Sequence, residues 1–146
     1  MRDISNISVI SHVIQLAIAP VFLLSAIGTL LNVTTSRLGR IIDRSRHLEE
    51  KLENATLPEK VEELNTGLSK LSRRTKIMDI SIALFTFSAL LVCAVITILF
   101  LGDFLEFKIT IPVAVLFIIA TILLVLGLLC FLLEIFIATR TLIGKR

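Results

Sequence analysis

Three long windows of this 146-residue chain are apolar and free of charged residues. Their apolar cores are residues 13–33, 80–101 and 109–133. Each core is long enough for a helix that crosses a hydrocarbon layer of about 30 Å, which needs roughly 20 residues. The pattern therefore predicts an all-α membrane protein with three transmembrane helices.

Between the first and second windows, apolar residues recur at spacings that alternate between three and four. This alternation is typical of a coiled-coil seam. The two predicted seam runs are Leu38, Ile41, Ser45, Leu48, Leu52 and Ala55, then Val61, Leu64, Leu68, Leu71, Thr75 and Met78. The segment NATLPE between them predicts a turn, with Thr56 as the N-cap and Glu59 completing a capping box. A long antiparallel helical hairpin is therefore expected between the first and second spans.

Few helix breakers interrupt the junctions between the hairpin arms and the spans, so two very long helices are expected. The predicted segments are an outer N-terminus with the first transmembrane helix (1–36), a cytoplasmic helical hairpin (37–78), the second transmembrane helix (79–101), an outer loop (102–109), the third transmembrane helix (110–139) and a cytoplasmic tail (140–146). The sides follow from the Lys and Arg residues, which concentrate in residues 34–77 and at the C-terminus. Basic residues in short loops favour the cytoplasm, which leaves the N-terminus outside.

Composition agrees with a membrane protein, because the chain is 55% apolar with a mean hydropathy of +0.94. Soluble domains are about 45 to 50% apolar. His12 and His47 are the only histidines and are predicted on opposite sides of the membrane, so no metal site, cofactor site or His-dependent enzyme is expected. Cys93 and Cys130 lie among apolar residues and are interpreted as packing residues. The basic residues are interleaved with acids and lack aromatic partners, so no nucleic-acid binding is expected.

One face of the first helix carries mostly small and polar residues, here called the polar stripe. Its members are Ser11, Gln15, Ile18, Phe22, Ser25, Thr29, Asn32 and Ser36. Only Ile18 and Phe22 are bulky and apolar, as expected of a pore helix with a hydrophobic gate. The alternative is an ordinary helix contact, because small and hydroxylated residues let membrane helices approach and hydrogen-bond. Both interpretations turn this face toward protein or water, since an unpaired amide in lipid is costly.

Four ionisable residues are predicted near the cytoplasmic boundary as a charge belt, namely Arg37, Arg40, Asp79 and Glu134. Arg74 and Lys76 are further candidates to pair with the two acids. An ionisable residue inside a span is a functional candidate. The belt is interpreted as structural ion pairs, and the alternative is a proton or cation route through Glu134.

The segment IAPVFLLSAIGTLLNVTTSRLGRIIDRSRHLEE, residues 18–50, closely resembles the hallmark segment of a family of small bacterial membrane proteins classified as domain of unknown function 2721. The likeness extends over nearly the whole chain. The resemblance implies a three-span protein of the bacterial inner (plasma) membrane. It brings no activity, cofactor or catalytic residue with it.

Three spans can scarcely shield the polar stripe, so a homo-oligomer with cyclic symmetry is expected in the bilayer. The leading hypothesis is an ion-conducting channel lined by the first helix, with monovalent cations as candidate permeant ions. The alternative is a non-conducting structural or adaptor protein whose hairpin recruits an unknown cytoplasmic protein.

Overall fold

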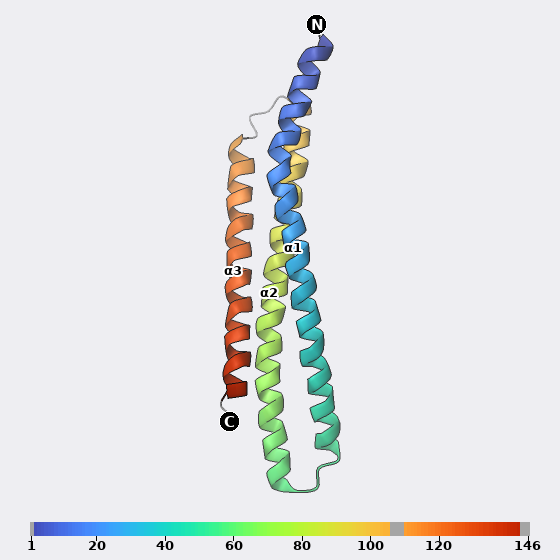
Figure 1. The fold of residues 1–146 in the computed structure, drawn as a ribbon, viewed down its shortest axis with the longest axis vertical. Coiled ribbons are helices and arrows are strands. Elements are labelled where there is room, and N and C mark those ends of the chain that lie inside the picture. Colours follow the sequence, from blue (N-terminus) through green and yellow to red (C-terminus); the bar gives the residue numbers. More distant parts are fainter. Residues whose placement is uncertain (1, 106–109, 144–146) are drawn as a thin grey trace. The chain divides into compact units, whose positions relative to one another are not determined.

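The structure is a computed structural model that describes the backbone of residues 2–105 and 110–143, and the side chains of residues 11, 14–102 and 110–139. The described residues form three helices, α1 (Arg2–Glu53), α2 (Pro58–Leu105) and α3 (Thr110–Ile143) (Figure 1). Each contains a segment long and apolar enough to cross a membrane, at Ile14–Glu53, Pro58–Gly102 and Thr110–Thr139. The predicted all-α class with three candidate spans is confirmed.

The helices are longer than the predicted spans. α1 and α2 have 52 and 48 residues and run without interruption from the apolar windows to the hairpin turn, which confirms the expected two very long helices. α2 also continues through Leu105, into the segment 102–109 that was expected to be a loop. Residues 106–109 lie outside the described residues. α3 continues to Ile143, into the predicted tail.

The turn between α1 and α2 places the start of α2 one residue later than the sequence pattern predicts. The backbone N–H of Val61 donates to the carbonyl of Leu57 at 3.2 Å, and this first helical bond makes Leu57 the N-cap. Pro58 is then the first helical residue, where its missing N–H is not needed. The predicted capping box of Thr56 and Glu59 is therefore wrong, because both residues lie one position too early.

The chain divides into two compact units. Unit 1 comprises Met1–Leu30 and Leu84–Val125, and unit 2 comprises Leu31–Ala83 and Leu126–Arg146. Each unit therefore contains one part of each of the three helices. The two units are described separately below.

In unit 1, α1 buries Ile27, and α2 buries Phe85 and Val92. Ser88 of α2 is also fully buried, and its hydroxyl donates to the backbone carbonyl of Ala120 in α3 at 2.8 Å. A small residue such as Ala120 lets two membrane helices approach closely enough for such a bond. The α2–α3 contact in unit 1 thus combines close packing with one hydrogen bond.

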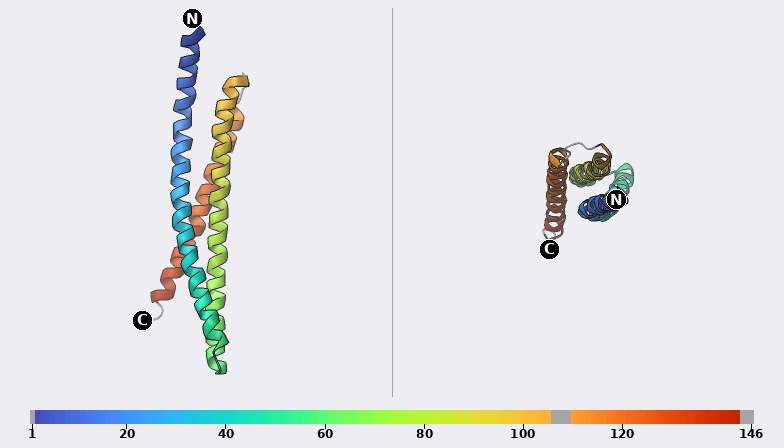
Figure 2. Two further views of the ribbon diagram at one scale, coloured as in Figure 1. Left: turned by 90° about the vertical axis from the view of Figure 1, so that its right-hand side faces the viewer. Right: turned by 90° about the horizontal axis from the view of Figure 1, so that it is seen from above.

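In unit 2, the second half of α1 and the first half of α2 run side by side as an antiparallel hairpin (Figure 2). Ile41, Leu71 and Met78 form its buried apolar core, against which Leu38, Leu48 and Phe131 pack. Every residue of the two predicted seam runs is buried or half-buried. The seam positions are thus those that face the interior of unit 2, whereas coiled-coil packing as such stays a prediction.

Ser81 of α2 links the hairpin to α3 in unit 2. Its buried hydroxyl donates to the carbonyl of Gly127 at 2.6 Å. Gly127 has no side chain, which allows the two helices to approach closely. Each unit therefore has one serine of α2 that bonds to a backbone carbonyl of α3 at a small residue.

Phe85 and Phe87 provide a matched test of the packing in unit 1, because Phe85 is fully buried and Phe87 is 61% exposed. Phe85→Ala should lower the free energy of unfolding by about 3 to 5 kcal/mol, since it leaves a cavity that its neighbours fill only in part. Phe87→Ala should change it little. Unfolding of the purified protein in detergent measures both, and equal losses for the two variants would contradict the described packing.

Candidate functional site

Glu134 is an acidic residue buried in the middle of unit 2. It lies on α3 inside the candidate span Thr110–Thr139, and only 1% of its surface is exposed. Removing a carboxylate from water costs free energy unless cations and hydrogen-bond donors surround it. The geometry around Glu134 shows how this chain meets that requirement.

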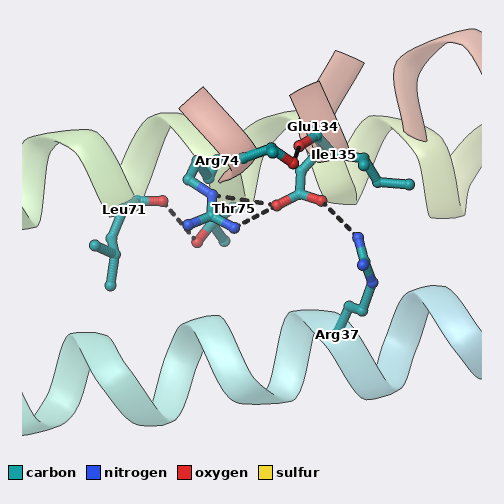
Figure 3. A network of polar contacts seen from close by, with 7 residues as sticks. Arg37, Leu71, Arg74, Thr75, Glu134 and Ile135 are labelled. Atoms are coloured by element: carbon teal, nitrogen blue, oxygen red, sulfur yellow. Dashed lines mark hydrogen bonds and ion pairs between the residues drawn. The ribbon is translucent and has the colours of Figure 1, made fainter. Parts of the chain in front are cut away.

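Two arginines from different helices reach Glu134 (Figure 3). Arg74 of α2 donates from Nη2 to Oε1 at 2.6 Å and from Nε to the same oxygen at 3.2 Å. Arg37 of α1 donates from Nη1 to Oε2 at 3.3 Å. Both carboxylate oxygens therefore accept charge-assisted hydrogen bonds, which are stronger than neutral ones. We call these three residues the arginine clamp.

Phe131 helps to position the weaker arm of the clamp. It lies almost one turn before Glu134 on α3, and the guanidinium carbon of Arg37 is 5.5 Å from the centroid of its ring. This is within the range of a cation–π interaction, which contributes about 0.5 to 2 kcal/mol depending on exposure. Arg37 is thus held on α3 by an aromatic face and by a carboxylate at once.

The arginine clamp joins all three helical segments of unit 2 at one carboxylate. Removing one partner of a buried ion pair costs about 3 to 5 kcal/mol, because the remaining charge is left without compensation. Two guanidinium groups beside Glu134 also repel a passing cation. The geometry therefore favours a structural ion network over a cation route through this residue.

The predicted charge belt is brought together only in part. The structure places Arg37 against Glu134, as the belt required, and adds Arg74 as the second partner. Asp79 is exposed and makes no ion pair within the described part of the chain. Arg40 is also exposed and unpaired among those residues. Arg74 stands next to the seam position Thr75, but so does the exposed Lys76, so spacing along α2 alone does not identify Arg74 as the partner.

The polar stripe lies on the outside of the described chain. All eight of its residues, six in unit 1 and Asn32 and Ser36 in unit 2, are exposed. In unit 1, α1 buries Ala17 and Ile27 instead, and in unit 2 it buries Thr34 and Ile41. None of the stripe residues is therefore buried by the described helices.

Two hydroxyl groups of the polar stripe are bonded within their own helix. The hydroxyl of Thr29 donates to the carbonyl of Ser25 at 3.2 Å, and that of Ser36 donates to the carbonyl of Asn32 at 2.8 Å. Such bonds to the preceding turn satisfy a hydroxyl without any outside partner. The amide groups of Gln15 and Asn32 and the hydroxyl groups of Ser11 and Ser25 have no hydrogen-bond partner among the described residues.

No group of three or more His, Cys, Asp and Glu side chains that could hold a metal ion occurs among the described residues. Cys93 and Cys130 are free thiols. Thr34, Ser81 and Ser88 are polar residues that the sequence pattern did not single out and that the structure buries. The serines recur at a helical interval of seven, which is the only sequence signal that could have revealed them.

These features define an all-α protein whose three helices are each long and apolar enough to cross a membrane, with a buried ion network in one of its two units. The chain belongs to the family described as "Protein of unknown function (DUF2721)", whose family model matches residues 17–143. The resemblance drawn from residues 18–50 is thereby confirmed. Comparison with curated proteins and with solved structures finds no significant match.

Glu134→Gln tests the arginine clamp, because it keeps the side-chain shape and removes the charge. We expect the free energy of unfolding to fall by about 3 kcal/mol, since two guanidinium groups then face a neutral amide. Asp79→Asn is the matched control, an exposed acid of the same predicted belt, and should leave stability nearly unchanged. Thermal unfolding in detergent compares the two variants. A similar loss of stability in both variants would mean that the Glu134 carboxylate does not stabilise unit 2 through the arginine clamp.

Proposed function

We propose that this chain is a homo-oligomeric integral membrane protein that conducts ions along the polar stripes of its α1 helices. The observation that supports the proposal most is the outward orientation of the whole stripe on the described chain. The amide groups of Gln15 and Asn32 need partners that the described residues of their own chain do not provide, and lipid cannot supply them. A second copy of the chain or a column of water can.

Ile18 and Phe22 are the proposed gate. Both protrude from the stripe in unit 1, with 48% and 74% of their surfaces exposed. Placed around an axis of cyclic symmetry, such side chains form an apolar ring that excludes water when narrow. The hydroxyl of Thr29 and the amide of Asn32 would line the wider path, with monovalent cations as the permeant ions.

In the proposed topology, the protein lies in a bacterial plasma membrane with its N-terminus outside. The hairpin arms, which pack together in unit 2, then project into the cytoplasm with the C-terminus. The excess of Lys and Arg in the hairpin supports this orientation. We assign the chain no catalytic role.

A sealed assembly is the second candidate. The hydroxyl groups of Thr29 and Ser36 are already satisfied by carbonyls of their own helix, so they require no water. A dry α1–α1 interface would then close the axis, and the protein would act as a structural or adaptor protein through its cytoplasmic hairpin. Conductance separates the two candidates.

Phe22→Ser should raise the conductance of the purified protein in planar bilayers, because a polar residue at the constriction favours a wetted pore. Val21→Ser is the matched control, since Val21 is a neighbouring exposed residue outside the stripe, and it should not change conductance. The absence of ion current in the wild type and in both variants would rule out the pore and leave the sealed assembly.

Cross-linking tests the α1–α1 contact independently of conduction. In a chain with Cys93 and Cys130 replaced by alanine, Ser25→Cys should form disulfide-linked dimers on mild oxidation, since Ser25 belongs to the stripe. Ala26→Cys has similar exposure and points about 100° away around the helix, so it should form few. Gel electrophoresis without reductant measures the yield, and a higher yield for Ala26→Cys would place the contact on another face.

A further inference from the structure

We propose that a basic hollow in unit 2, beside the arginine clamp, binds the phosphate group of an anionic ligand. The hollow has a volume of about 240 Å³. It is lined by Arg37, Arg40, Ile41, Arg44, Leu71, Arg74, Glu134 and Ala138. Its walls come from segments of α1, α2 and α3 that all belong to unit 2. The inference does not depend on whether the protein conducts ions.

The charge of the hollow is strongly positive. Four arginines line it against one acid, Glu134, which leaves three positive charges without compensation. Glu134 is already bonded to Arg37 and Arg74. Arg40 and Arg44 have no ion pair within the described part of the chain, although Asp43 lies between them in the sequence. Their guanidinium groups are therefore available to an external anion.

The arrangement of these arginines suits phosphate. Arg37, Arg40 and Arg44 lie on one face of α1, because residues three and four apart on a helix are neighbours. A guanidinium group donates two parallel hydrogen bonds that match the oxygens of a phosphate, and it stays charged at any physiological pH. Ile41, Leu71 and Ala138 add an apolar wall, which excludes water from part of the hollow and strengthens the attraction.

The size and position of the hollow favour a phospholipid headgroup over a larger ligand. Its volume is below the roughly 300 to 1,000 Å³ of pockets that enclose whole small molecules. Arg37 directly follows the charge-free window of α1, so the hollow lies where apolar helix gives way to charged helix. In the proposed topology this level faces the cytoplasmic leaflet, where basic pockets between helices bind anionic headgroups. A free phosphate anion has the same chemistry and is the other source that the experiment distinguishes.

The test uses the whole chain, purified in neutral detergent and stripped of bound lipid. Native mass spectrometry measures the binding of phosphatidylglycerol, with zwitterionic phosphatidylcholine as the reference lipid. A thermal-shift titration with inorganic phosphate forms the second arm. The test variant is Arg40→Gln with Arg44→Gln. The control is Arg46→Gln with Arg73→Gln, which removes the same charge from exposed positions on α1 and α2 that lie outside the hollow.

We expect phosphatidylglycerol to bind the wild type more tightly than phosphatidylcholine does, and the test variant to bind it about 25-fold more weakly. This figure assumes that each arginine contributes about fivefold to the affinity, which is the contribution of one basic residue near an anionic surface. The control variant should lose less than about threefold. If inorganic phosphate raises the thermal stability of the wild type and of the control variant but not that of the test variant, the hollow binds free phosphate as well. Two results overturn the proposal. One is an equal loss of phosphatidylglycerol affinity in the test and control variants. The other is a wild type that binds phosphatidylglycerol no more tightly than phosphatidylcholine and is not stabilised by inorganic phosphate.

Discussion

A polar group inside a bilayer must find its partner within protein or water, because hydrocarbon offers none. The interior of the described chain obeys this constraint, since every buried side-chain nitrogen and oxygen has a hydrogen-bond partner. Glu134 is bound by two arginines, and Ser81 and Ser88 donate to backbone carbonyls of α3. The amides of the polar stripe are exposed and lack such partners within the described chain. The same constraint therefore stabilises each unit and is the basis for the partner proposed on the outer face of α1.

The arginine clamp and the basic hollow are two consequences of one arrangement. A single carboxylate on α3 neutralises part of a dense arginine cluster and, in doing so, joins α1 and α2 to α3 in unit 2. Because the cluster holds more arginines than acids, positive charge remains after the clamp has formed. A buried ion network is costly to disrupt, because loss of one partner leaves a buried charge without compensation. The remaining charge makes the same region suited to an external anion.

The parts of the fold that could be predicted from the sequence are those where apolar and charged residues contrast. The hairpin arms are amphipathic, so the seam from Leu38 to Met78 identifies the inward positions. Within the spans both the inner and the lipid-facing sides are apolar, and this contrast disappears. Ser81 and Ser88 were missed for that reason, because a hydroxyl that bonds to another helix looks in sequence like one that bonds to its own. Arg74 was only one candidate among several partners of Glu134, since pairing depends on the geometry of three helices rather than on spacing along one.

We propose above all that the outward face of α1 meets other copies of the same chain. The number of subunits in a particle extracted directly into lipid nanodiscs, measured by native mass spectrometry, tests this claim most directly. A ring with more than two subunits is the predicted result, because only such a ring surrounds an axis with polar stripes. A stable monomer in lipid would contradict the account, since Asn32 and Gln15 would then face acyl chains without a partner.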